Sequence, residues 1–271
     1  MVRRARLDVE LVRRGLARSR EHAAELVMQR RVRIAGMTAT KPATGVERDT
    51  PLLVHAKDDE PEWVSRGARK LHGALGDLIA GGPAVTGRRC LDAGASTGGF
   101  TDVLLHRGAR EVMAVDVGYG QLAWSLRTDQ RVQVHDRTNV RTLRPEDIGG
   151  TVELAVADLS FISLRLVLPA LVGCTAPEGD LLPMVKPQFE VGRDLLGSGG
   201  VVRDPALRAQ SMLDVLASAA GFGLGLVDAV ASPLPGPSGN VEYFLWLRRD
   251  VSDPLRTVEE QVHGAVRRGP Q

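Results

Sequence analysis

From Arg89 onward, short apolar segments of the kind that form buried strands alternate with segments of helical periodicity. The predicted strands are 90–93, 112–115, 132–134, 154–157, 181–185, 224–230 and 243–247, and the predicted helices include 98–106, 205–220 and a tail after Pro254. This alternation indicates an α/β domain with a doubly wound sheet that is covered by helices on both faces. In that architecture ligands bind at the carboxyl ends of the strands.

The composition of the 271 residues narrows the class of protein. Hydrophobic residues make up 43% and charged residues 25%, which is ordinary globular usage and argues against a disordered or fibrous chain. The two cysteines, Cys90 and Cys174, cannot form a disulfide framework and favour a reducing compartment. No uncharged apolar segment reaches the ~18 residues of a membrane span, and the N-terminus lacks the apolar core of a secretory signal. We therefore expect a soluble cytoplasmic protein that does not bind membranes.

The charge is distributed unevenly along the chain. The net charge of +2 combines about +6 on residues 1–70 with about −4 on the rest, and ten arginines fall in the first 33 residues. A small basic unit joined to a mildly acidic body is typical of a protein that binds a polyanion, and nucleic acid is the first candidate. A solvated basic face without a partner is the alternative.

The first part of the chain is predicted to form two short helices and a small hairpin. Leu7, Leu11 and Leu16 recur at helical spacing, and Ser19 can cap a second helix before predicted strands at 32–34 and 52–54. The segment that follows is charged and contains proline, which is typical of a linker. We expect a small α+β domain at 1–57, a linker at 58–64 and the α/β domain at 65–271.

This first segment resembles the αL RNA-binding module found at the end of many rRNA-modifying enzymes and in a small-subunit ribosomal protein. The resembling residues are L-D-x-E-L-V-R-R-G-L-A-R-S-R from Leu7 to Arg20, then 23–26, then V-x-I-x-G from Val32 to Gly36. Arginines in such a module can contact phosphates without reading the base sequence. The candidate RNA-binding residues are Arg4, Arg6, Arg13, Arg14, Arg18, Arg20, Arg30 and Arg31.

A glycine-rich loop follows the first strand of the α/β domain and opens a helix. It reads Asp92-Ala93-Gly94-Ala95-Ser96-Thr97-Gly98-Gly99-Phe100. A dinucleotide fingerprint requires a glycine where Ser96 stands, so that the backbone can approach a pyrophosphate. S-adenosylmethionine has no phosphate, so it fits this loop better and is the predicted cofactor. A phosphate-binding loop of another α/β enzyme is the alternative.

Acidic residues near this loop complete the predicted cofactor site. Asp116 stands at the end of the second strand, 22 residues after Gly94, where a carboxylate can accept hydrogen bonds from both ribose hydroxyls. Asp92 can hold the loop or the methionine amino group, and Asp136 is a candidate for the adenine edge. The predicted cofactor-binding residues are Asp92, Gly94, Ala95, Ser96, Thr97, Gly98, Gly99, Phe100, Asp116, Asp136 and Asp158.

Four charged residues stand where a doubly wound fold collects its ligand site. Lys70 lies on the helix before the first strand. Asp158 ends the fourth strand, Lys186 ends the fifth, and Glu242 opens the last. A single charge at such a place is usually solvated or ion-paired, but four at the edge of an apolar core require a reason. They are the predicted catalytic residues, and no metal site is predicted.

The order K…D…K…E resembles the 2′-O-ribose RNA methyltransferases of the FtsJ type. Over nearly the whole chain, the motifs SRG-x-x-KL, DAG-x-STGGF, DVGYGQL, DLSFISL, VKPQFE-x-G and SP-x-x-G-x-x-GN-x-E resemble those of the TlyA family, in the same order. The resemblance implies a Rossmann-like methyltransferase domain that methylates cytidine 2′-hydroxyls of 16S or 23S rRNA, or of both, with S-adenosyl-L-methionine. It also implies rRNA or ribosomal subunits as partners, and we expect a monomer.

In the expected reaction the ribose 2′-oxygen displaces the methyl group in line, so the protein must align the two and manage one proton. We expect Lys186 to be the catalytic lysine, Lys70 and Glu242 to fix the hydroxyl, and Asp158 to orient Lys186. A lysine that acts as a base must be neutral. The nearby carboxylates would raise the pKa of Lys186, while Lys70 and the sulfonium of the cofactor would lower it, so its protonation state stays open.

Two other functions remain possible from the sequence. A non-catalytic RNA-binding protein could keep the methyltransferase fold as a scaffold. A nicotinamide-dependent reductase is disfavoured by Ser96 and by the basic first module. Trp63 and Trp124 are expected to be packing residues, with a cover over part of the adenosine as the alternative for Trp124, which is near the cofactor loop. The proline-rich loop 233–239 is expected beside the active site.

Overall fold

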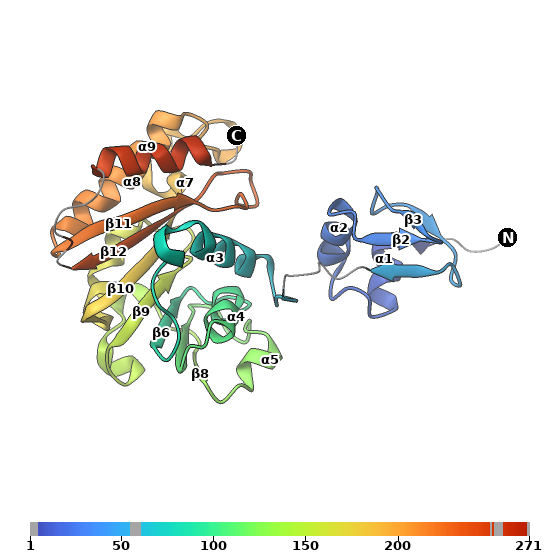
Figure 1. Cartoon of the computed structure of the whole chain (residues 1–271), viewed down its shortest axis with the longest axis horizontal. Coiled ribbons are helices and arrows are strands. Elements are labelled where there is room, and N and C mark those ends of the chain that lie inside the picture. Colours follow the sequence, from blue (N-terminus) through green and yellow to red (C-terminus); the bar gives the residue numbers. More distant parts are fainter. Residues whose placement is uncertain (1–4, 55–60, 250, 252–256, 270–271) are drawn as a thin grey trace. The chain divides into compact units, whose positions relative to one another are not determined.

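The computed structural model describes residues 5–54, 61–249, 251 and 257–269. The chain forms two compact units, Met1–Glu62 and Trp63–Gln271 (Figure 1). The expected linker at 58–64 spans this division, and its residues 58–60 lie outside the described ones.

The first unit is a small α+β domain. Its elements are β1 (Ala5–Arg6), α1 (Leu7–Arg13), α2 (Arg20–Met28), β2 (Val32–Ile34), β3 (Met37–Thr38), β4 (Gly45–Val46) and β5 (Leu52–Val54). Ser19 caps α2 as expected, because its hydroxyl accepts a hydrogen bond from the backbone N–H of His22. The strands form a β3-β2-β5 sheet and a separate β1–β4 pair, which sequence periodicity missed since each strand of that pair has two residues. Leu7, Leu11 and Leu26 form part of its buried core.

The second unit is built on one seven-stranded sheet. Its strands are β6 (Arg89–Ala93), β7 (Glu111–Val115), β8 (Val132–His135), β9 (Val152–Ala157), β10 (Thr175–Val185), β11 (Leu224–Ala231) and β12 (Tyr243–Arg249). Their order is β11-β12-β10-β9-β6-β7-β8, with β12 antiparallel to both of its neighbours and β6 to β10 parallel. All seven predicted strands are present. The direction of winding reverses between β6 and β9, which is where a doubly wound sheet binds its ligand.

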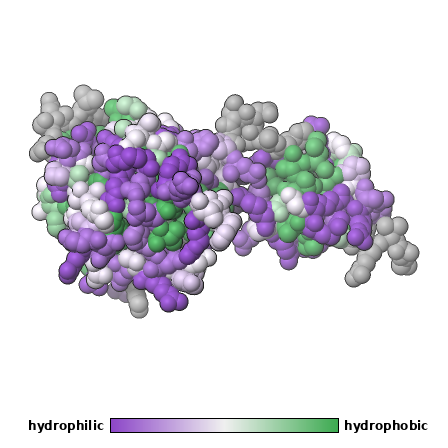
Figure 2. All heavy atoms as spheres, turned by 90° about the horizontal axis from the view of Figure 1, so that it is seen from below, coloured by the Kyte–Doolittle hydropathy of each residue, from purple (hydrophilic) through white to green (hydrophobic). Residues whose placement is uncertain are grey.

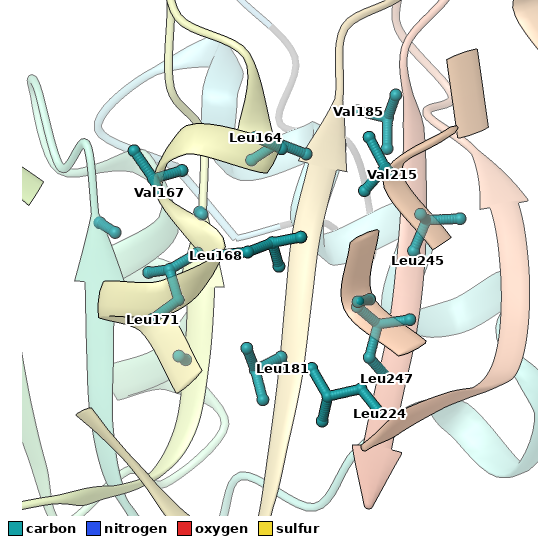
Figure 3. Close-up of a cluster of buried hydrophobic side chains, with 14 of the residues drawn as sticks. Leu164, Val167, Leu168, Leu171, Leu181, Val185, Val215, Leu224, Leu245 and Leu247 are labelled. Carbon is teal, nitrogen blue, oxygen red and sulfur yellow. The ribbon is translucent and has the colours of Figure 1, made fainter. Parts of the chain in front are cut away.

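Helices cover both faces of this sheet, as predicted. One face carries α3 (Arg66–Asp77), α4 (Gly99–His106) and α5 (Trp124–Arg127). The other carries α6 (Leu168–Cys174), α8 (Pro205–Ala220) and α9 (Val258–Arg268). Figure 3 shows Leu168 and Leu171 of α6 beside Leu181 of β10, with Leu245 and Leu247 of β12 on the other side of that strand. The short α7 (Pro187–Glu190) follows β10 directly. Single 3-10 turns are η1 (Ile79–Gly81), η2 (Val140–Thr142), η3 (Pro145–Ile148), η4 (Leu164–Leu166), η5 (Arg193–Leu195) and η6 (Ser198–Gly200).

The two tryptophans singled out in the sequence differ in environment. Trp63 is buried with 4% of its surface exposed and packs between the rings of His72 and His106, as expected of a packing residue. The same expectation is wrong for Trp124, which is 76% exposed, because α5 is one turn long and its buried residue is Leu126.

The face of the larger unit that is visible in Figure 2 is mainly polar. Figure 2 shows hydrophilic side chains over most of the visible face of the larger unit, with smaller apolar areas between them. None of the helices in the described ranges combines the length and the apolar character needed to cross a bilayer.

Candidate active site

The order of the strands brings three of the four predicted catalytic residues to one edge of the sheet. Asp158 follows β9 and Lys186 follows β10, which are parallel neighbours, so both lie at carboxyl ends. Glu242 precedes β12. Because β12 runs antiparallel to β10, with Tyr243 opposite Val185, the start of β12 meets the end of β10. The first residues of β12 therefore lie at the same edge of the sheet as the last residues of β9 and β10.

The four side chains meet as two ion pairs. Lys70, from the first half of α3, places Nζ 2.5 Å from Oε2 of Glu242. Nζ of Lys186 lies 2.6 Å from Oδ1 of Asp158. Both lysine side chains and that of Glu242 are less than 10% exposed, whereas Asp158 is 23% exposed. Each lysine thus faces a carboxylate that compensates its charge in a largely buried place, which fixes the geometry of both pairs.

The two pairs line one open cavity of about 280 Å³. Its lining consists of Ser65, Arg66, Gly67, Lys70, Gly94, Ala95, Ser96, Thr97, Gly99, Phe100, Asp158, Ser160, Lys186, Pro237 and Glu242. The structure therefore brings all four predicted catalytic residues together with the glycine loop. A cavity that joins a glycine turn to four convergent charged groups can hold a small molecule and act on it.

The glycine loop packs tightly against the strand that carries Asp158. Gly94 has φ +89°, and a Cβ added there would lie 2.5 Å from the carbonyl oxygen of Asp158. Gly98 has φ +96°, and its added Cβ would lie 2.2 Å from Leu126. Glycine is required at both positions by the backbone conformation and by the close neighbours.

Asp116 holds this loop from the end of β7. Its Oδ2 accepts a hydrogen bond from the backbone N–H of Ser96 at 2.8 Å, and its Oδ1 accepts one from Gly118 at 2.7 Å. A carboxylate has about four acceptor sites, so capacity for ligand hydroxyls is left on both oxygens.

The predicted cofactor residues divide into two groups. Gly94 to Thr97, Gly99, Phe100 and Asp158 line the cavity. The residues that do not line it are Asp92, Gly98, Asp116 and Asp136. Asp136 accepts hydrogen bonds from the backbone N–H of Gly120 and from Arg127, so it stabilises the neighbouring loop.

Asp92 is fully buried, and its contacts are with the helix that follows the glycine loop. Its Oδ2 accepts hydrogen bonds from the backbone N–H and the hydroxyl of Thr101, at 2.8 and 2.7 Å, which holds the first turn of α4. Burial raises the pKa of Asp92 to about 7, against the opposing effect of these hydrogen bonds.

These residues fit S-adenosylmethionine better than a dinucleotide. Ser96 carries a side chain where a pyrophosphate would need bare backbone, and its φ of +47° turns the chain without a glycine. Asp116 stands at the strand end where a ribose is bound in such folds. Gly94 to Thr97 would hold the methionine end and Asp116 the ribose.

Five residues of the lining were not predicted from the sequence as site residues: Ser65, Arg66, Gly67, Ser160 and Pro237. The S-R-G and D-L-S-F motifs contain the first four and the proline-rich loop contains the fifth, so the signal was present. Arg66 donates a hydrogen bond to the carbonyl oxygen of Pro235 at 2.7 Å and so links α3 to the proline-rich loop, whose Pro237 reaches the cavity.

In the first unit, two buried carboxylates organise the candidate RNA-binding arginines. Asp8 pairs with Arg6 at 2.9 Å and Arg20 at 3.2 Å, and the hydrogen bond from Arg6 is the main reason why the pKa of Asp8 falls to about 2. Arg6 and Arg20 keep 51% and 62% of their side chains exposed, so their charges face solvent in fixed positions.

Glu10 pairs with Arg13 and Arg14, and the two arginines differ. Arg14 is 20% exposed and also donates to the carbonyl oxygens of Glu47, Arg48 and Thr50, so its guanidinium is used by the fold, and we remove it from the candidate set. Arg13 is 47% exposed. Arg18 and Arg30 are exposed, Arg31 is half-buried, and Arg4 lies outside the described residues.

The comparisons with known proteins agree with both units. Residues 63–249 match the FtsJ-like methyltransferase family, and residues 5–50 match the S4 domain. The Mycobacterium tuberculosis 16S/23S rRNA (cytidine-2′-O)-methyltransferase TlyA is 62% identical over 100% of both chains. A Bacillus subtilis protein named "Putative rRNA methyltransferase YqxC" is 44% identical over 90% of this chain and 86% of its own.

A solved structure supports the fold over both units. The Streptococcus thermophilus protein named "Putative hemolysin" has a TM-score of 0.74 and 36% identity, and the match covers 98% of this chain and 96% of that one. Identity of this extent over the full length, together with both domain matches, means that the chain belongs to the TlyA family of FtsJ-like methyltransferases with an N-terminal S4 domain.

Proposed function

We propose that this protein transfers the methyl group of S-adenosylmethionine to the 2′-hydroxyl of cytidine in rRNA. The observation that carries the proposal is the meeting of Lys70, Asp158, Lys186 and Glu242 in one cavity beside the glycine loop. The 62% identity with an enzyme named for this reaction supports the substrate.

S-adenosylmethionine supplies an activated methyl group, so the protein has mainly to align the nucleophile and to manage its proton. We assign Lys186 to the ribose 2′-oxygen, because it lines the same cavity as the loop that would hold the cofactor. Asp158 orients Lys186 through their 2.6 Å contact.

The second ion pair is assigned to the same hydroxyl. Lys70 comes from α3 and Glu242 precedes β12, so the position of the hydroxyl would be fixed by both elements together. A carboxylate accepts a hydrogen bond and an ammonium donates one, so the pair can bind a hydroxyl group through both its hydrogen and its oxygen.

The S4 domain is assigned to RNA affinity. Its exposed arginines can neutralise phosphates without reading sequence, which suits a domain that delivers a catalytic unit to a structured RNA. We propose that the protein acts as a monomer on 16S and 23S rRNA in ribosomal subunits, and hence in the cytoplasm.

The test is transfer of tritiated methyl groups from S-adenosylmethionine to isolated small and large ribosomal subunits. We expect label in rRNA, 2′-O-methylcytidine after nuclease digestion, and none with the Lys186→Ala variant. Cofactor binding by calorimetry without any methyl transfer would instead favour a non-catalytic RNA-binding protein that keeps the fold as a scaffold.

A further inference from the structure

Lys186 has a second hydrogen-bond acceptor besides Asp158. Its Nζ donates to Oγ of Ser160 at 2.9 Å, while Oδ1 of Asp158 lies 2.6 Å from the same nitrogen. Ser160 also lines the cavity. It stands two residues after Asp158, so one short segment supplies both acceptors.

Two acceptors constrain a lysine nitrogen more than one does. The nitrogen has four tetrahedral positions, and one of them is the bond to Cε. Asp158 takes a second position and Ser160 a third, so one is left. That position carries an N–H if the lysine is charged and the lone pair if it is neutral, and in both states it has a single direction.

We propose that Ser160 is a positioning residue for Lys186, and that it directs the remaining position of Nζ toward the ribose 2′-oxygen. This rests on the proposed function. Without Ser160, the acceptor Asp158 alone would leave two equivalent positions for the substrate contact. Ser160 is neutral, so it orients Lys186 without changing the charge of the cavity.

The backbone conformation of the residue after Ser160 is consistent with a fixed contact between Ser160 and Lys186. Phe161 has φ +64°, a conformation that is costly for a bulky side chain and that persists only where the surroundings impose it. This turn immediately follows the residue whose hydroxyl must reach Lys186.

A second set of hydrogen bonds joins the loop that carries Ser160 to the segment that carries Lys186. Glu190, at the end of α7, accepts hydrogen bonds from the hydroxyl of Ser163 at 2.6 Å and from the backbone N–H of Leu164 at 2.7 Å. Because α7 begins directly after Lys186, the loop that carries Ser160 is fixed to the segment that carries Lys186 at both of its ends.

The test uses the full-length protein with Ser160→Ala and Ser160→Thr. We expect Ser160→Ala to lower kcat about tenfold or more, since a hydrogen bond to the reacting group is lost, with the rRNA KM and the cofactor Kd changed less than about threefold. Ser160→Thr keeps the hydroxyl and should restore most of kcat. A merely structural role would not separate kcat from KM or respond to the hydroxyl in this way.

Ser218→Ala, on α8 away from the cavity, is the matched control and should behave as the wild type. Thermal unfolding of each variant shows that it is folded. Wild-type kcat in Ser160→Ala, equal losses in the alanine and threonine variants, or a loss confined to KM would each overturn the role of Ser160. Absence of methyl transfer by the wild type would overturn the proposed function and this inference with it.

Discussion

Lys70 and Glu242 are 172 residues apart in the chain, and their charged groups meet at 2.5 Å in a buried pair. The first belongs to the helix that precedes the sheet and the second to the start of its last strand. The contact therefore forms only when the whole second unit has folded, and it joins the beginning and the end of that unit at the cavity.

Removing the charge of one partner should lower both stability and activity, whereas replacing both partners with apolar residues should lower activity alone. Glu242→Gln leaves a buried ammonium without its counter-charge, and we expect a loss of about 3 kcal/mol in the free energy of unfolding. The double variant Lys70→Met, Glu242→Leu removes both charges and should unfold near the wild-type denaturant concentration, but with activity lowered about 100-fold or more. Urea unfolding and methyl-transfer assays check both statements. A double variant with wild-type activity would contradict the assignment to the hydroxyl.

Lys186→Ala should abolish methyl transfer and leave the Kd of S-adenosylmethionine within a few fold. The reason is that Lys186 is assigned to the 2′-oxygen of the RNA ribose, while the glycine loop of the same cavity would hold the cofactor. Isothermal calorimetry and a transfer assay measure the two quantities on one preparation. If cofactor affinity collapsed together with activity, Lys186 would be a cofactor-binding residue.

Asp92 should make the stability of the protein depend on pH. Its pKa rises from 3.8 to about 7 on burial, so the folded state binds the proton more tightly between these values. Its contribution to stability is therefore fully present below about pH 4 and is lost as the pH rises toward 7. Asp92→Asn removes this dependence, so the variant should gain stability relative to the wild type between pH 4 and pH 8, by about 4 kcal/mol at most.

Urea unfolding of both proteins across this pH range measures the difference. Asp77→Asn, at the exposed end of α3, is the control and should follow the wild-type curve. Parallel stability curves for Asp92→Asn and the wild type would show that Asp92 ionises in the folded state as it does in the unfolded chain.

The S4 domain should contribute through phosphate contacts. We expect the double variant Arg18→Ala, Arg30→Ala to weaken rRNA binding and to reduce the slope of log K against log salt concentration by up to about 2, since each lost phosphate contact removes about 0.7 to 0.9. Cofactor affinity should not change. Arg267→Ala, on the exposed face of α9, removes one positive charge outside the S4 domain and is the control. Unchanged salt dependence in the double variant would exclude both arginines from the interface.

The sequence was sufficient for the seven strands of the large sheet, for α3, α4, α8 and α9, and for the list of charged residues at strand ends. Alternating apolar segments predict buried strands, and the glycine loop marks the first crossover. The pairing of Lys70 with Glu242 could not be predicted in this way, because it depends on β12 entering between β10 and β11 in the opposite direction.

Local contacts account for the other differences. Arg14 looks like its arginine neighbours in the sequence, but three backbone carbonyls far along the chain use its guanidinium. Ser160 was overlooked, although it lies in the D-L-S-F motif, because a serine is inconspicuous beside the charged Asp158, and only its distance from Lys186 distinguishes it. Trp124 was misjudged because a large aromatic residue is usually buried, which a single-turn helix on the surface does not permit.

The close approach of Gly94 to the carbonyl oxygen of Asp158 has a consequence for inherited variation at this site. Any larger residue at 94 would have to displace the end of the strand that carries Asp158. One mutation would therefore disturb both the glycine loop that would bind the cofactor and the position of Asp158. A mutation that changes the affinity for the methyl donor without changing the methyl-transfer step must therefore lie elsewhere in the loop. Thr97 borders the same cavity and already carries a Cβ, so it is a position where such a change can be made.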